Sequence, residues 1–244
     1  MRAVRIHVDL PLAAGVETVL PAQAGEHVAR VLRLAPGDPL TLFNGDGNDY
    51  AATIASVGKR EVLVHVRDGH AVDRESPLRL TLAQGVARGE KMDLIVQKAT
   101  ELGVARIVPL LTERSEVKLD AARAEKRLAH WRAVAASACE QCGRARLPEI
   151  SPTLALPAWL ASLEDHAAWR LALLPEATTS VRGLHPPGDG ALLVVGPEGG
   201  LGERDVTLLG EAGFTGVRLG PRILRTETAG LAALAALQAW HGDF

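Results

Sequence analysis

Hydrophobic and polar residues alternate along the first part of the chain with the period of two that is typical of β-strands. The alternation and the turn sequences between its segments predict strands over Val4–Val8, Pro39–Phe43, Tyr50–Ile54 and Val62–Val66. A helix is expected near His27–Leu34. Residues 1–75 are therefore predicted to form a small β-rich domain, built as a short-strand barrel or sandwich.

After the polar segment Asp68–Pro77, which we interpret as a linker, the pattern changes to strands that alternate with helices. The predicted strands are Leu78–Ala83, Arg106–Leu111, Trp169–Leu174, Ala191–Val195 and Val217–Leu219. The predicted helices are Glu90–Leu102, Asp120–Cys142, Glu203–Ala212 and Thr226–Trp240. Such alternation favours a mostly parallel sheet, so residues 76–244 are predicted to form an α/β domain.

Composition excludes some classes of protein. The chain has 244 residues, a net charge of −2 and 47% hydrophobic residues, which is typical of a globular protein of one or two domains. Its longest apolar stretches are far shorter than the roughly 20 residues that cross a bilayer. We expect a cytoplasmic protein with no membrane partner.

Basic residues outnumber acidic ones between Gln84 and Arg146, and such an excess suits an RNA backbone, although it also suits a solvated helix surface. The candidate RNA-binding residues, on the first helix and in this basic region, are His27, Arg30, Arg33, Arg88, Lys91, Arg114 and Arg144.

The two cysteines lie in Cys139-Glu-Gln-Cys142, a spacing that matches a redox dithiol or half of a zinc site. The pair falls inside a predicted helix, and the chain has no second pair to complete a zinc site. We favour packing thiols and predict no metal.

A glycine-rich loop, Gly196-Pro-Glu-Gly-Gly200, follows a buried strand and precedes a helix, which is where ligands prefer to bind in α/β sheets. Its glycines are not in the register of a dinucleotide-binding fingerprint, and the chain has no phosphate-binding P-loop motif. A plain strand-to-helix connection remains the alternative.

A second loop, Leu219–Ala229, also joins a strand to a helix, with Thr226 as a plausible N-cap. Arg222 and Arg225 flank the apolar pair Ile223-Leu224, which would suit an adenine ring beside an anion, although ordinary surface arginines remain possible. A third predicted strand ends in Pro175-Glu176.

Five segments together carry a resemblance to a known family: Lys91–Val104, Pro109–Ser115, Ala138–Arg144, Gly196–Gly200 and Leu219–Ala229. In this order they resemble the bacterial 16S rRNA uracil-N3 methyltransferases, which belong to the SPOUT class. The resemblance covers essentially the whole chain, and its first part is similar to a PUA-like RNA-binding domain.

The resemblance implies a SPOUT-type α/β domain with a deep carboxyl-terminal trefoil knot, a homodimer with active sites at the subunit interface, and S-adenosylmethionine as cofactor. It implies that 16S rRNA or the small ribosomal subunit is the partner. The loops after three strands would hold the cofactor through Leu173, Leu174, Pro175, Val195, Gly196, Pro197, Glu198, Gly199, Gly200, Leu219, Gly220, Arg222, Ile223 and Leu224.

Methylation of uracil N3 requires removal of a proton or stabilisation of the uracil anion as it develops. We expect Arg225 or Arg5 to supply the cation, and Glu198 or Glu227 to act as base or orienting group. The target base must be unpaired or flipped out. The alternatives are an enzyme of the same class that acts on tRNA, a nucleotide-dependent oxidoreductase, whose glycine fingerprint is missing, and a non-catalytic RNA-binding protein.

Overall fold

The computed structural model describes residues 4–116, 120–164, 169–181, 184, 188 and 190–244. The chain forms two compact units, of which the first contains Met1–Glu75 and Ala136–Leu147 and the second contains Ser76–Ala135 and Pro148–Phe244. A single boundary after residue 75 therefore does not describe the chain, because Ala136–Leu147 packs with the first unit. Within the described ranges, no helix is long and apolar enough to span a membrane.

The first unit is built on a five-stranded sheet with the strand order β1-β3-β4-β5-β2. The strands are β1 Val4–His7, β2 Glu17–Val19, β3 Pro39–Phe43, β4 Asn48–Val57 and β5 Val62–Ala71. Only β1 and β3 are parallel to each other, and the other pairs are antiparallel. Alternate side chains such as Leu40, Leu42, Ile54 and Val64 point into one apolar core.

Several elements of this unit differ from the prediction: β2 was not predicted, and β4 extends beyond Tyr50–Ile54 at both ends. Strand β5 continues to Ala71, inside the predicted linker, because its backbone keeps pairing with β4 as far as Asn48 although the side chains there are exposed. The helix begins earlier than predicted, as α1 (Ala22–Glu26), and continues as a π-helix, η1 (His27–Val31).

Arginine side chains of the first unit bind the carboxyl end of helix α3 (Ala121–Cys142) and the residues after it. Arg5 Nη1 donates a hydrogen bond to the carbonyl oxygen of Cys139 at 2.7 Å, and Arg74 Nη1 donates to that of Gly143 at 2.6 Å. The last carbonyl groups of a helix have no partner within the helix, so cations placed there satisfy them and oppose the negative end of its dipole. These bonds explain why Ala136–Leu147 belongs to the first unit.

The second unit contains an eight-stranded sheet with the order β11-β13-β10-β12-β6-β7-β8, in which β9 also pairs with β7. The strands are β6 Arg79–Gly85, β7 Arg106–Leu111, β8 Glu149–Ile150, β9 Leu154–Ala155, β10 Trp169–Leu173, β11 Thr179–Ser180, β12 Gly190–Val195 and β13 Thr215–Arg218. All of these pairs are parallel, as the alternation of strands and helices predicts. The unpredicted strands β8, β9 and β11 are too short to show a period.

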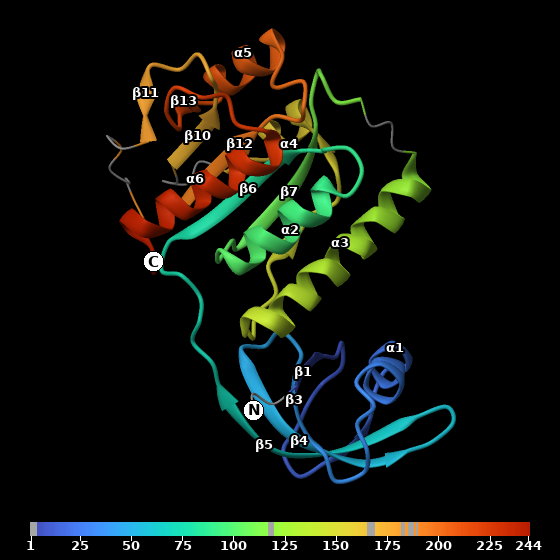
Figure 1. Ribbon diagram of the computed structural model, residues 1–244. Helices are drawn as coiled ribbons and strands as arrows, with labels where there is room; N and C mark the ends of the chain where they lie inside the picture. The colour runs from blue at the N-terminus through green and yellow to red at the C-terminus, as the bar shows by residue number, and fades with distance from the viewer. Residues whose placement is uncertain (1–3, 117–119, 165–168, 182–183, 185–187, 189) are drawn as a thin grey trace. The chain divides into compact units, whose positions relative to one another are not determined.

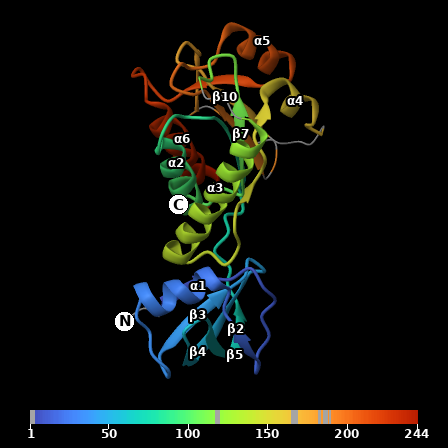
Figure 2. The same ribbon diagram turned by 90° about the vertical axis from the view of Figure 1, so that its right-hand side faces the viewer.

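Helices cover both faces of this sheet (Figure 1; Figure 2 shows a second view). They are α2 Lys91–Glu101, α4 Leu156–Ala161, α5 Glu203–Glu211, α6 Thr226–His241 and part of α3. Strand β12 shows how the two faces form, because Leu193 and Val195 pack with α2 and α6, whereas Val194 packs with α4 and α5. A strand buried on both faces is apolar at successive positions, which explains the continuous run in the sequence.

The chain returns across the sheet after its last strand. Strand β13 pairs with β10, whereas the following helix α6 contacts α2, β6 and β12. This arrangement is the mixed α/β domain with a mostly parallel sheet that the sequence predicts. The threading of the trefoil knot stays a prediction, because pairings of elements do not establish which segment passes through which loop.

Helix α5 receives its amino-terminal cap from a distant loop. Gly202 precedes the helix and has no side chain that could cap it, but Glu113 Oε2, from the loop after β7, accepts the backbone N–H of Arg204 at 3.1 Å. Asp205 Oδ2 accepts the backbone N–H of Gly202 at 3.0 Å. A Cβ atom at Gly202 would collide with the Glu113 side chain, so this cap requires glycine.

We therefore expect Gly202→Ala to lower the free energy of unfolding by about 1–2 kcal/mol, because Glu113 must move and the hydrogen bond that it accepts from the Arg204 backbone is lost. The matched control is Gly210→Ala within α5, where an added Cβ meets no atom within 4 Å. That change should be neutral or stabilising, by up to about 1 kcal/mol. Urea unfolding of the two variants measures the difference, and equal stabilities would contradict this account of the cap.

Candidate active site

A cavity of about 920 Å³ lies in the second unit, at the carboxyl ends of β10, β12 and β13. It is at the upper end of the roughly 300–1,000 Å³ that is usual for ligand pockets. All of the residues that the sequence predicts to hold a cofactor line it, from Leu173 in the first loop to Leu224 in the third. The three loops, far apart in the sequence, therefore meet at one place.

Glycine is required where the loop after β12 approaches the end of β6. A Cβ atom at Gly85 would lie 2.5 Å from Pro197 Cδ and 2.6 Å from Pro197 N. At Gly196 it would lie 2.7 Å from the carbonyl carbon of Gly200, which itself has a φ of 71°. The loop folds back tightly on itself. Because its glycines have no side chains, the loop presents its backbone where it lines the cavity.

Hydrogen bonds join this loop to the start of α6. Thr226 Oγ1 donates to the carbonyl oxygen of Gly196 at 2.6 Å and accepts a hydrogen bond from Gln84 Nε2 at 2.9 Å. Gln84 is completely buried at the end of β6. The Thr226 hydroxyl therefore joins two of the three loops, and the buried Gln84 amide holds it in place.

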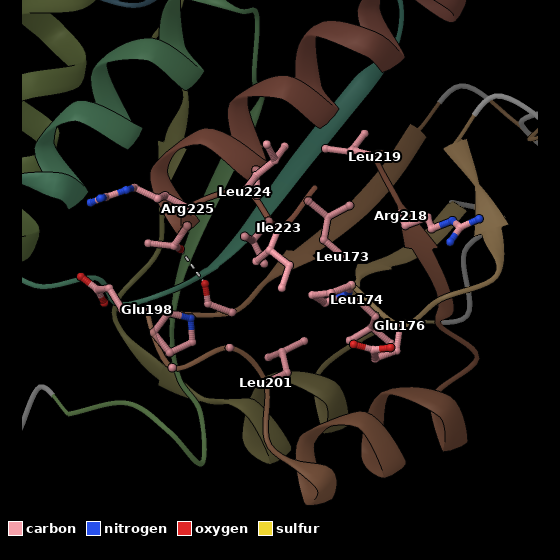
Figure 3. Close-up of a pocket in the computed structure, with 18 of the residues that line it drawn as sticks. Leu173, Leu174, Glu176, Glu198, Leu201, Arg218, Leu219, Ile223, Leu224 and Arg225 are labelled. Carbon is pink, nitrogen blue, oxygen red and sulfur yellow. Dashed lines mark hydrogen bonds between the residues drawn. The ribbon is translucent and has the colours of Figure 1, made fainter. Parts of the chain in front are cut away.

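The cavity has an apolar middle and charged ends (Figure 3). Glu198 and Arg225 lie at one end, Glu176 and Arg218 lie at the other, and leucines such as Leu173 lie between them. Such a shape suits an elongated ligand that has a flat or apolar part and polar groups at both ends.

Two carboxylates and an ammonium group form a cluster at the first of these ends. Lys91 Nζ, at the start of α2, lies 3.0 Å from Glu198 Oε1 and 3.7 Å from Glu227 Oε2. The Glu227 side chain is 16% exposed, and its Oε2 atom accepts no hydrogen bond from any residue that the structure describes. Buried acceptors are normally hydrogen-bonded, so this carboxylate, which lines the cavity, is a candidate to bind a donor group of a ligand.

The surroundings of Glu198 keep it ionised. Partial burial acts to raise its pKa, but hydrogen bonds from the backbone N–H groups of Glu198 and Arg88, together with the Lys91 ammonium, hold the pKa below its usual value. A carboxylate with a lowered pKa is a weak base. Glu198 is therefore better suited to orient a neighbouring group than to remove a proton.

Several residues predicted to bind RNA lie around this cavity. Lys91 and Arg114 line it, and Arg114 Nη1 donates to the carbonyl oxygen of Gly199 at 3.1 Å. Arg88 is exposed and pairs with Glu116. Lys91 lies within ion-pair distance of Glu198 and Glu227, and its contact with an RNA phosphate stays a prediction.

The structure corrects two predictions in the first unit. Arg5 was expected to supply a catalytic cation, but it is 8% exposed, pairs with Asp49 at 2.6 Å and lies over the Phe43 ring. Arg144 was expected to bind RNA, but it is 4% exposed and its guanidinium bonds Glu75. Both arginines are buried and paired inside the first unit, where Arg5 joins the end of α3 to β1 and Arg144 joins the segment after α3 to Glu75.

The other predicted RNA contacts of the first unit are accessible. His27, Arg30 and Arg33 are exposed, and Arg30 pairs with Glu26 on the surface at 2.6 Å. Arg33 has a φ of 55°, which is uncommon for a residue other than glycine.

Sequence reasoning missed Gln84 and Arg218, which shape the cavity, whereas it placed Glu176 at the end of a predicted strand. Thr226 was predicted only as an N-cap, but its hydroxyl bonds the Gly196 carbonyl instead. A polar residue at the carboxyl end of an otherwise apolar strand is the signal that could have identified Gln84.

Comparison with known proteins identifies the class. Residues 74–238 match the model of an RNA methyltransferase domain, and residues 20–67 match that of an RNA methyltransferase PUA domain. The chain is thus an RNA methyltransferase with a PUA domain, as its fold and its strand-end cavity indicate.

The most similar relatives narrow this class. A Legionella pneumophila methyltransferase, solved with its bound cofactor SAM, is 40% identical, with both chains fully covered and a TM-score of 0.96. Ribosomal RNA small subunit methyltransferase E from Neisseria gonorrhoeae, bound to S-adenosyl methionine, is 37% identical, again with full coverage and a TM-score of 0.92. The Bacillus subtilis protein of that name is 34% identical over 86% of this chain and 85% of its own. The chain belongs to the ribosomal RNA small subunit methyltransferase E family.

The correction for Arg5 can be tested by Arg5→Met. Removing one partner of a buried ion pair should lower the free energy of unfolding by about 3–5 kcal/mol, because Asp49 is left unpaired. The variant that still folds at low temperature should bind the cofactor as the wild type does. Urea unfolding and calorimetry measure the two effects, and a stable variant that had lost only methyl transfer would restore Arg5 as a catalytic residue.

Proposed function

We propose that this protein transfers the methyl group of S-adenosylmethionine to N3 of a uracil in the 16S rRNA of the small ribosomal subunit. The observation that supports it most directly is the cavity at three strand ends, which is lined by the Glu227 carboxylate beside the Lys91 ammonium. The relatives solved with this cofactor support its identity.

The residues around the cavity fit S-adenosylmethionine. Its flat adenine matches the apolar middle near Leu173, Leu219 and Leu224. Its hydroxyl, amino and carboxylate groups match the polar ends and the glycine-rich backbone at Gly196–Gly200. The volume of about 920 Å³ leaves room for a nucleobase beside the cofactor.

When bound, the cofactor supplies a methyl carbon made electrophilic by its sulfonium sulfur, which departs with the electrons of the broken bond. The protein must orient uracil N3 in line with that carbon and accept the N3 proton. We assign the proton to Glu227, whose Oε2 atom accepts no hydrogen bond from the described residues, rather than to Glu198, which already accepts bonds from Arg88 and Lys91.

Arg225 is the cation that we assign to the uracil as its N3 proton leaves. Negative charge develops on the two carbonyl oxygens of the base, and an arginine placed beforehand stabilises it without rearrangement. Arg225 is exposed, lines the cavity and lies at the same end as Glu198 (Figure 3).

The first unit is the proposed RNA-holding part, because it matches a PUA domain and carries exposed His27, Arg30 and Arg33. The homodimer and the cytoplasmic location that the sequence predicts belong to the same proposal. Light scattering of the purified protein would measure the oligomeric state.

The target can be read by mass spectrometry of small-subunit rRNA from cells with and without the gene. We expect one uracil to lose an N3 methyl group in the deletion strain and to regain it on complementation. An rRNA that is identical in the two strains would reject the proposed function. Comparing naked 16S rRNA, assembled small subunits and tRNA as substrates separates this activity from that of a tRNA enzyme.

Replacing Glu227 by Gln tests the assigned base. We expect the single-turnover rate to fall by about 10²–10⁴-fold, the usual contribution of a general base. The matched control is Glu211→Gln, which changes an exposed carboxylate on α5 outside the residues that line the cavity. Transfer of labelled methyl groups to small subunits measures both, and an unchanged rate in Glu227→Gln would remove Glu227 from this role.

A further inference from the structure

The position of Lys91 is not explained by the stability of its own helix. It is the first residue of α2, where the N–H ends of the peptide dipoles make a cation unfavourable. Residue 90, which precedes the helix, makes no capping bond through its side chain. A lysine at this place must therefore gain its stabilisation from elsewhere.

That stabilisation comes from two other segments of the same unit. The Lys91 ammonium lies 3.0 Å from Glu198 Oε1, in the loop after β12, and 3.7 Å from Glu227 Oε2, in the first turn of α6. The lysine side chain is 34% exposed and the two carboxylate side chains are 30% and 16% exposed, so solvent screens this cluster only in part.

The two carboxylates differ in the bonds that they already make. Glu198 Oε1 accepts the Lys91 ammonium and the Arg88 backbone N–H, which both hold it in place. Glu227 Oε2 is near the ammonium but accepts no hydrogen bond within the described part of the chain. Glu198 is thus fixed by two hydrogen bonds, whereas Glu227 lies close to the Lys91 ammonium and its Oε2 atom has no hydrogen-bond donor among the described residues.

We infer that Lys91 is a positioning residue for methyl transfer: it holds Glu198 and Glu227 together, so that the Glu227 carboxylate at the cavity is in place to accept the proton of the target base. This inference rests on the proposed function and gives Lys91 a role other than binding RNA phosphates. Without the ammonium, two carboxylates at one end of a cavity repel each other and bind protons more readily.

Other charged groups also act on this cluster. The charged side chains that line the cavity besides the three are Arg114, Glu176, Glu203, Arg218, Arg222 and Arg225. They are common to wild type and variants, so a change confined to residue 91 isolates the contribution of its ammonium.

The variants are Lys91→Met, which removes the charge and keeps the length, and Lys91→Arg, which keeps the charge. Lys98→Met is the matched control, because Lys98 lies on the same helix, pairs with Glu101 at 2.8 Å and is not among the residues that line the cavity. Each protein is measured for cofactor affinity, for affinity to small subunits and for the single-turnover rate with both substrates saturating.

We expect the rate of Lys91→Met to fall about 100-fold, within the range of a misplaced general base. Affinity for the small subunit should change less than about threefold, since a lost phosphate contact is what would weaken it. Lys91→Arg should recover most of the rate, and Lys98→Met should match the wild type. A normal rate in Lys91→Met, a loss confined to the affinity for RNA or cofactor, or equal losses in the Met and Arg variants would each overturn the inference.

A second measurement needs no RNA and so separates this inference from the proposed function. Carbon-13 NMR of labelled glutamate carboxyls, assigned with Glu198→Gln, follows the titration of Glu198. Its lowered pKa should rise in Lys91→Met and stay unchanged in Lys98→Met, because the lysine is one of the groups that lower it. A Glu198 that titrates alike in all proteins would overturn the role of Lys91, whereas rRNA without the N3 methyl group would overturn only the proposed substrate.

Discussion

The close approach of two backbone segments, at Gly85 and Pro197, determines how the rest of the second unit is arranged. No side chain fits between them, so the end of β6 and the loop after β12 are in direct contact. At this contact the Thr226 hydroxyl joins the Gly196 carbonyl to the first turn of α6 and accepts a hydrogen bond from the Gln84 amide. Three segments distant in the sequence are therefore fixed at one point.

That point is also where the cavity begins. The apolar core aligns the parallel strands, and because all of them run the same way, their carboxyl ends open on one edge of the sheet. The loops at this edge lie outside the apolar core, so they can carry charged residues, here Glu198, Arg225 and Glu227. The apolar residues that stabilise the sheet and the charged residues of the cavity therefore lie next to each other along the same strands. The contact between Gly85 and Pro197 lies between the two groups.

Prediction from the sequence succeeded where burial of apolar side chains determined the structure of a segment. Apolar runs placed β3 and β7 at their observed bounds, because strands with buried residues leave a clear pattern. The prediction failed where backbone hydrogen bonds alone determine the length of a strand. At the end of β5, pairing with β4 continues although the side chains are exposed. The charged residues show the same limit: Arg5, Lys91 and Arg144 have partners that lie far away in the chain.

The sequence by itself determined the class of each unit, the glycine-rich loops and many of the residues that line the cavity, since these depend on local patterns and on motifs. Only the tertiary structure decided which charges face a ligand and which neutralise one another. Arginine and lysine look alike in a sequence whether they meet a phosphate or a buried carboxylate. Their roles depend on distances between segments, such as the 3.0 Å from Lys91 to Glu198, that no local pattern encodes.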